Sequence, residues 1–262
     1  MEDVLVYPLK NSKDYNDILD SIGQDGNIQI TGLTWAGKQN LAYSLFKDLS
    51  RQVLYVASTE YEAKRAYEEL SVYLKDKVSY LGSNEILFYN LDARDRKVDA
   101  RRLKVFIKLI NKDKSVFVTS VDALTRKYMP KKLITDNTFK LKVGRTQDIQ
   151  ELTQKLVDLG YQRVVKVEGF GQFSVRGGIV DIFTLMYDFP LRIEFFDDEI
   201  DSIREFDVYS QKSIDKKKSV TITPSRDFIY PKDVTGAIEK IKSEIRDDTD
   251  LDVHKNLERL EN

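Results

Sequence analysis

Three residues of one short stretch could bind phosphate. Gly32 is followed after four residues by Gly37 and Lys38, between an apolar stretch and a helical pattern. This is the spacing and context of a phosphate-binding loop, in which backbone N–H groups and a helix N-terminus hold the phosphate oxygens. The ammonium group of Lys38 would neutralise part of the phosphate charge. The stretch therefore predicts an anion site and, in its complete form, a nucleotide site.

The residues around this loop depart from what ATP hydrolysis needs. A working loop continues with Ser or Thr, whose hydroxyl group binds Mg²⁺, whereas Gln39 follows Lys38 here. Trp35 is bulky for the crown of such a loop, and no acidic run follows a buried strand. The sequence favours a relic loop that at most binds an anion over a working ATPase. Weak nucleotide binding stays open, because the glycine and the lysine are retained.

A second group of residues could bind a protein partner. The segment LRIEFF over 191–196 alternates, so that Arg192, Glu194 and Phe196 face one way and the three apolar residues between them face the other. An exposed aromatic ring beside an arginine has the composition of a binding hot spot. The alternative is that another part of the chain covers Phe196, and periodicity alone does not decide between the two.

Other charged residues suggest no catalytic or metal site. A turn explains the pair Asp197-Asp198 without chemistry, and no nucleophile has a base nearby. The chain has no cysteine and a single histidine, His254, so neither a thiolate metal site nor a histidine-based triad is expected. A basic run over 94–104 could follow phosphates, but aspartates are interleaved with it, and a salt-bridged helix face is the favoured interpretation.

Composition and charge limit the classes of function that this chain can have. The 262 residues carry 42 basic and 43 acidic side chains, for a net charge of -1, so there is no overall attraction to nucleic acid. The N-terminus has no apolar signal segment, and no apolar run reaches membrane-spanning length. We expect a cytoplasmic protein.

The strand and helix patterns change near Pro130. Before it, apolar strands alternate with amphipathic helices, which is typical of a parallel sheet covered on both faces. The predicted strands cover 28–33, 53–57, 78–81 and 115–120, and the predicted helices cover 15–22, 38–49, 60–74 and 101–110. After it, a helix over 147–159 lies among alternating strands, which include 139–144 and 161–167 and indicate an α+β domain. We expect an α/β body over 1–130, an α+β domain over 131–224 and a charged helical segment over 225–262.

Three strings carry a family resemblance: GQFSVRGGIVDIF (171–183), RIEFFDDEIDSIREFD (192–207) and YSQKS (209–213). They closely resemble the N-terminal module of bacterial transcription-repair coupling factor, which is itself similar to the excision-repair subunit UvrB. The resemblance implies an α/β fold: a RecA-like parallel-sheet domain with a degenerate phosphate loop at Gly32, Gly37 and Lys38. It also implies an inserted, UvrB-like α+β domain of mainly antiparallel strands.

The resemblance also implies a partner and its contact residues. In both families this domain contacts the repair ATPase UvrA, and the matching residues here are Arg176, Arg192 and Phe196. Arg176 joins the other two on resemblance alone. Its alternative is an internal ion pair with one of the three acidic residues at 197–199. Gly177 and Gly178, next to Arg176, predict a bulge or a close backbone approach that directs that side chain.

What the parent family does lies largely outside this chain. Its members resemble ATP-dependent DNA translocases that displace stalled RNA polymerase and recruit nucleotide-excision repair. The motor with its ATP and Mg²⁺, the polymerase contact and the double-stranded DNA contact belong to other parts, so no cofactor and no enzyme activity are expected here. UvrB carries a long tyrosine-rich hairpin where this chain has only a short link over 90–100. The alternatives are a phosphate-loop ATPase or a UvrB-like module that binds damaged DNA, and the near-neutral charge and the missing hairpin speak against the second.

Overall fold

The computed structural model describes residues 6–83 except 23 and 25, residues 96–227, and residues 229 and 239. The chain forms two compact units, Met1–Asp227 and Phe228–Asn262, and nearly all of the described residues belong to the first. Most of the predicted helical segment 225–262, with His254, lies outside the described residues, and so does most of the link over 90–100. The predicted domain boundaries at 130 and 224 stay predictions.

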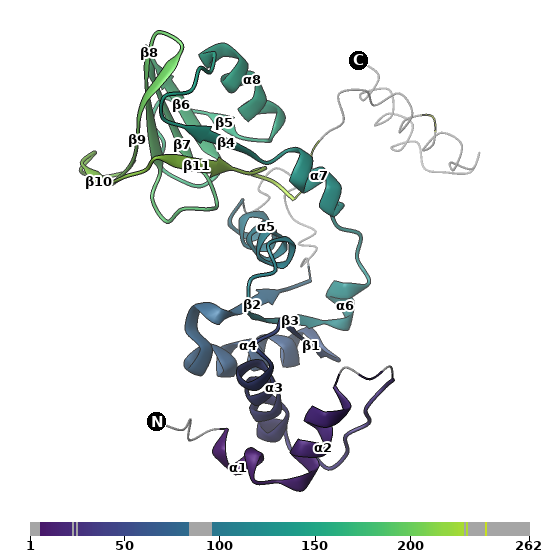
Figure 1. Cartoon of the computed structure of the whole chain (residues 1–262). Helices are drawn as coiled ribbons and strands as arrows, with labels where there is room; N and C mark the ends of the chain where they lie inside the picture. Colours follow the sequence, from purple (N-terminus) through teal and green to yellow (C-terminus); the bar gives the residue numbers. More distant parts are fainter. Residues whose placement is uncertain are drawn as a thin grey trace. The chain divides into compact units, whose positions relative to one another are not determined.

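A small parallel sheet organises the first part of the chain (Figure 1). Its strands run in the order β1-β3-β2, and both pairings are parallel. The elements of this part are α1 (Tyr7–Lys10), α2 (Lys13–Ser21), α3 (Trp35–Leu49), β1 (Val53–Ala57), α4 (Glu60–Leu74), the 3-10 turn η1 (Lys75–Lys77), β2 (Val78–Leu81), α5 (Arg96–Ile110), β3 (Val116–Ser120), α6 (Val121–Leu124) and α7 (Lys131–Asp136). The parallel pairing of strands separated by helices confirms the α/β expectation.

Helices cover the two faces of this sheet unequally. Val116 and Val118 of β3 belong to one core cluster with residues of α3 and α4, while Phe117 belongs to another with Val105 of α5 and Leu81 of β2. Because α5 packs against the β2 side, alternate residues of the edge strand β1 remain exposed. The prediction of a parallel sheet covered on both faces is therefore wrong at β1.

The prediction of a strand over 28–33 is also wrong. These residues form no strand in the structure, and Ile28, Ile30 and Leu33 are exposed. An apolar stretch becomes a buried strand only where a neighbouring strand pairs with its N–H and C=O groups. The mixed architecture of parallel and antiparallel sheets stands, whereas the RecA-like assignment stays a prediction.

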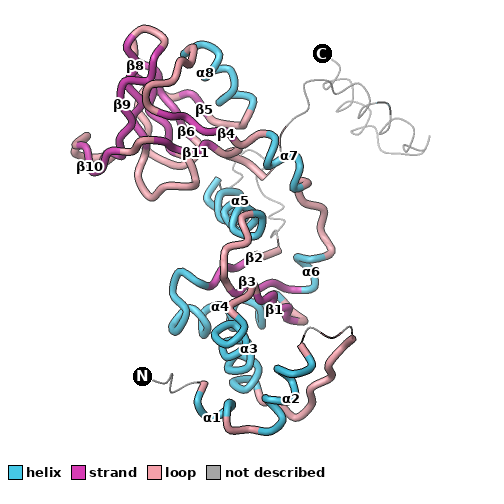
Figure 2. Tube along the Cα trace, in the orientation of Figure 1, coloured by secondary structure: helices cyan, strands magenta, loops and turns pink. Residues whose placement is uncertain are grey.

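Antiparallel strands dominate the second part of the chain, and Figure 2 shows them gathered there. A six-stranded sheet runs in the order β10-β9-β8-β7-β6-β5, antiparallel except between β5 and β6, and β4 pairs with β11 in a separate two-stranded sheet. The elements are β4 (Phe139–Lys142), α8 (Ile149–Asp158), β5 (Gln162–Arg163), β6 (Gln172–Arg176), β7 (Ile179–Phe183), β8 (Leu191–Phe196), β9 (Glu199–Phe206), β10 (Ser213–Lys216) and β11 (Ser219–Ile222). This matches the predicted α+β pattern, except that the strand expected over 161–167 is only two residues long.

The six-stranded sheet has one buried face and one polar face. Leu191 and Ile193 of β8 are fully buried with their cross-strand neighbours Ile203, Val180 and Ile182. α8, which Figure 1 shows beside this sheet, also has a buried side, formed by leucines at 152 and 156. The opposite face, on which Arg192 lies, is called the outer face below.

Candidate functional site

A buried carboxylate lies at the centre of the outer face. Asp181 of β7 is only 2% exposed, and arginines from both neighbouring strands bind it. Arg192 of β8 makes a two-pronged contact, with Nε 2.7 Å from Oδ1 and Nη2 2.8 Å from Oδ2. Arg176 of β6 donates from Nη2 to Oδ2 at 2.7 Å. A carboxylate can satisfy two guanidinium groups in this way because it offers about four lone-pair sites.

Strand register explains why these three residues meet. Asp181 lies directly opposite Arg192 across the β7–β8 pair, and Ile179 lies opposite Arg176 across the β6–β7 pair. Arg176 therefore reaches Asp181 diagonally, over a distance that a long side chain spans. Alternation along each strand keeps all three on the outer face.

Further contacts hold Arg192 in place. Its Nη2 donates to Oε1 of Gln211 at 2.9 Å, and its guanidinium lies 4.2 Å from the centre of the buried Phe206 ring. The hydrogen bonds to Asp181 raise the pKa of Arg192 above its usual value, so the group stays charged. The side chain of Arg192 is only 14% exposed. Arg192 lies on the predicted face, but its guanidinium is largely covered, and Asp181 and Gln211 accept from its Nε and Nη2.

Arg176 and Phe196 are the accessible members of the predicted set. Arg176 does form an internal ion pair, but with Asp181 rather than with residues 197–199, and its side chain is still 51% exposed. Phe196, at the end of β8, is 81% exposed, so no described part of the chain covers its ring. The structure thus leaves one arginine and one aromatic ring of the predicted three open to a partner.

Two tight turns shape the end of the outer face near Phe196. Asp197 has a positive φ of 56° in the turn between β8 and β9, which accounts for the acidic pair as turn residues. Gly177 also has a positive φ of 56°, and a side chain at Gly178 would lie 3.0 Å from the carbonyl oxygen of Phe195. The backbone N–H of Phe195 donates to the carbonyl of Gly178 at 2.8 Å. The predicted close backbone approach beside Arg176 is confirmed.

Comparison with known proteins finds a match for the part of the chain that carries this surface. Residues 139–228 match the family described as the UvrB interaction domain. The match begins with β4 and includes every residue of the outer face described above.

The chain also resembles longer proteins over most of its length. It is 30% identical over 239 residues to the transcription-repair-coupling factor of Staphylococcus haemolyticus (91% of this chain, 20% of that protein). The corresponding protein of Bacillus subtilis is 30% identical over 238 residues (90% and 20%), and that of Staphylococcus aureus strain USA300 is 30% identical over 244 residues (93% and 20%). The chain therefore spans about a fifth of the length of these curated relatives.

The predicted phosphate loop lies outside residues 139–228, and its geometry differs from a phosphate cradle. Helix α3 begins at Trp35, three residues before the predicted start, so Gly37 and Lys38 lie in its first turn. The hydroxyl of Thr34 caps the helix by accepting from the N–H of Gly37 at 3.2 Å, and the N–H of Lys38 donates to the carbonyl of Thr34. Two N–H groups that a phosphate would use are therefore already bonded. Gly32 has a positive φ of 80°, and Lys38 is exposed. Anion binding here stays a prediction.

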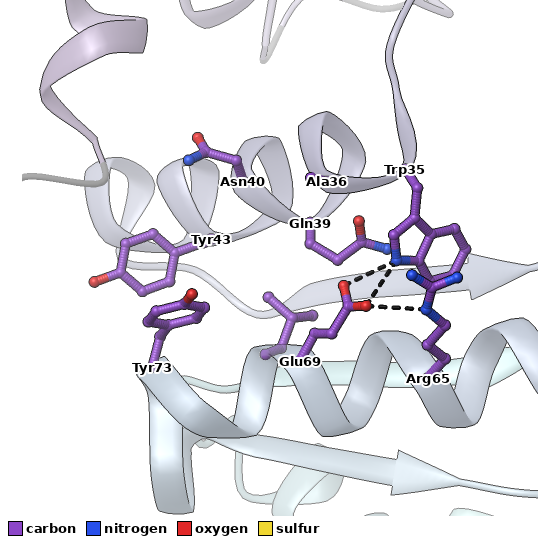
Figure 3. Close-up of a pocket in the computed structure, with 9 residues that line it drawn as sticks. Trp35, Ala36, Gln39, Asn40, Tyr43, Arg65, Glu69 and Tyr73 are labelled. Carbon is purple, nitrogen blue, oxygen red and sulfur yellow. Dashed lines mark hydrogen bonds and ion pairs between the residues drawn. The ribbon is translucent and has the colours of Figure 1, made fainter.

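A pocket that sequence reasoning missed lies between α3 and α4 (Figure 3). It has a volume of about 390 Å³, and Trp35, Tyr43 and Tyr73 form its aromatic walls. Nε1 of Trp35 donates to both carboxylate oxygens of Glu69 at 2.9 Å, and the guanidinium of Arg65 lies 4.6 Å from the Trp35 ring. These contacts show that Trp35 packs onto α4 instead of standing at the crown of a loop. Residues so far apart in the sequence carry no local signal of such a pocket.

Glu60 lies at the carboxyl ends of the parallel strands β2 and β3, where ligands of α/β proteins often bind. The carboxylate of Glu60, at the start of α4, accepts hydrogen bonds from Ser120 Oγ at 2.6 Å, from the backbone N–H of Ser83 at 3.0 Å and from the hydroxyl of Tyr80. Burial alone would raise the pKa of Glu60, but these hydrogen bonds outweigh it, and the pKa is lowered. Glu60 therefore joins α4 to the ends of β2 and β3, which is a structural role.

The basic run is only partly a solvated helix face. Arg102 is buried and pairs with Asp227, with its guanidinium 6.0 Å from the Tyr128 ring, while Arg101 and Lys104 are exposed. Arg94 lies outside the described residues, and so do the side chains of the two basic residues at 96 and 97. Within the part of the chain that is described, no group of three or more His, Asp or Glu residues could hold a metal ion. No described helix is long and apolar enough to span a bilayer.

Proposed function

We propose that the chain docks on UvrA through the outer face of its UvrB interaction domain. One observation carries this proposal: Phe196 is 81% exposed at the end of β8, the strand that also carries Arg192 of an arginine pair whose geometry a buried carboxylate fixes. Aromatic rings and arginines are the side chains that contribute most often to binding hot spots. The domain's description and the resemblance of its signature strings support UvrA as the partner.

The arginine pair suits a partner that brings carboxylates. Two guanidinium groups share the single carboxylate of Asp181. Arg176 uses one donor nitrogen on Asp181, and half of its side chain faces outward. A carboxylate of UvrA can therefore pair with its remaining donors. Arg192 contributes mainly by holding Asp181, and through it Arg176, in position.

The wider role rests on the relatives. Transcription-repair-coupling factors are about five times as long as this chain. We infer that docking on UvrA recruits nucleotide-excision repair to stalled RNA polymerase in the cytoplasm, and that the chain by itself neither hydrolyses ATP nor translocates. The translocase motor with ATP and Mg²⁺, and the contacts to RNA polymerase and double-stranded DNA, belong to parts of the parent outside this chain.

A titration of the purified chain against UvrA, with and without nucleotide, tests the proposal. We expect saturable one-site binding that Arg176→Ala weakens about tenfold, as expected for a hot-spot arginine. Arg51→Ala removes an exposed arginine outside the UvrB interaction domain and serves as the matched control. Absence of binding by the folded wild-type chain would reject the proposal.

A further inference from the structure

A second aromatic side chain stands fully exposed on a loop joined to the arginine pair. Tyr209, between β9 and β10, is 91% exposed, more than Phe196. Large apolar rings that protrude from a surface in this way are enriched at protein interfaces. The residue falls in the string YSQKS, but neither the family resemblance nor strand periodicity assigns it a role.

The loop that carries Tyr209 is held by its own hydrogen bonds. The carboxylate of Asp207 accepts from the backbone N–H of Ser210 at 2.7 Å and from its hydroxyl at 2.8 Å. The backbone N–H of Gln211 donates to the carbonyl of Asp207 at 2.8 Å, and its side-chain amide donates to the carbonyl of Val208 at 2.7 Å. A loop fixed in this way loses little conformational entropy when a partner binds.

The same loop is attached to the outer face through Gln211. The Gln211 amide oxygen accepts from Nη2 of Arg192 at 2.9 Å, and that nitrogen also binds Asp181. One hydrogen-bond network therefore sets the positions of Arg176, Arg192 and the Tyr209 loop together. A tyrosine attached to the same network as the proposed contact residues is placed for the same partner.

Distances along β8 are compatible with a single interface. Phe196 lies four residues beyond Arg192, which is about 13 Å along a strand. A standard interface buries about 800 Å² on each partner, which corresponds to a disc about 32 Å across. A partner centred on the arginine pair therefore reaches Phe196 at one end of β8, and the hydrogen bond from Arg192 to Gln211 places the Tyr209 loop beside the same pair.

We propose that Tyr209 is a second aromatic anchor for UvrA, with Phe196 at one end of the outer face and Tyr209 at the other. This inference rests on the proposed function. The tyrosine suits an apolar surface of UvrA that also offers a hydrogen-bond acceptor to the phenol hydroxyl.

The test compares two tyrosines of similar exposure. Tyr209→Ala is expected to weaken UvrA binding at least fivefold, whereas Tyr61→Ala removes a tyrosine of α4 that is 75% exposed and should leave binding unchanged. Asp207→Ala frees the loop and should also weaken binding, while Asp207→Asn keeps an acceptor oxygen and should restore it. Thermal unfolding of each variant confirms that it is folded.

The outcomes separate this inference from the proposed function. If Phe196→Ala loses affinity and Tyr209→Ala stays within twofold of wild type, the second anchor is rejected and the docking surface stands. If the folded wild-type chain does not bind UvrA, both are rejected.

Discussion

Replacing Phe196 by alanine is the most direct test of the docking surface. Complete burial of a phenylalanine side chain contributes about 1.5–3 kcal/mol relative to its exposed state. Because 81% of Phe196 is exposed in the free chain, most of that contribution is available to a partner. Covering the ring would therefore stabilise the complex by about 1.2–2.4 kcal/mol, which equals about an 8- to 60-fold change in Kd.

The same exposure predicts a small effect on folding. A side chain that is mostly in water in the folded state contributes little to stability, so Phe196→Ala should change the free energy of unfolding by no more than about 0.5 kcal/mol. Isothermal titration calorimetry against UvrA measures the Kd, and urea unfolding of the free chain measures the stability. Tyr61→Ala is the matched control in both assays. An unchanged Kd for folded Phe196→Ala would refute the reasoning, and so would a large loss of stability, since it would mean that the ring is buried.

The remaining predictions concern the two arginines that bind Asp181, the carboxylate of Glu60 and the lysine of the predicted phosphate loop. Arg192→Ala should lower the free energy of unfolding by about 2–4 kcal/mol, because it removes the two-pronged partner of buried Asp181. Arg176→Ala should lower it by less than about 1 kcal/mol, because this side chain is half exposed. Equal losses of stability for the two variants in urea unfolding would contradict this ranking. Glu60→Gln should destabilise the chain by about 1–2 kcal/mol at pH 7 through the lost charge-assisted hydrogen bonds. Because folding lowers the pKa of Glu60, its contribution is present above the usual value of 4.5 and is lost as the pH falls through the lowered pKa. The stability gap between wild type and Glu60→Gln should therefore narrow on acidification, and a gap that widens would oppose this assignment. Lys38→Ala should not change ATP hydrolysis, because none is expected, so Lys38-dependent hydrolysis of Mg-ATP by the purified chain would count against a degenerate loop.

Local patterns predicted much of the secondary structure. The helix over 60–74 and the strands over 53–57 and 78–81 have the predicted bounds, because an amphipathic or apolar period is a property of consecutive residues. The segment 28–33 has the same apolar character and forms no strand. Strand formation there depends on a neighbouring edge, which a local pattern does not contain.

The sequence likewise predicted some features of the candidate site but not others. Alternation over 191–196 established by itself that Arg192 and Phe196 share a face, and the glycine pair beside Arg176 indicated a close backbone approach. Only the tertiary structure decided that Asp181 lies between the two arginines, that Arg192 is covered and that Phe196 is open. The physical reason is that a period of two residues sets which face a side chain occupies, whereas its partners depend on cross-strand register and on loops brought in from elsewhere in the chain.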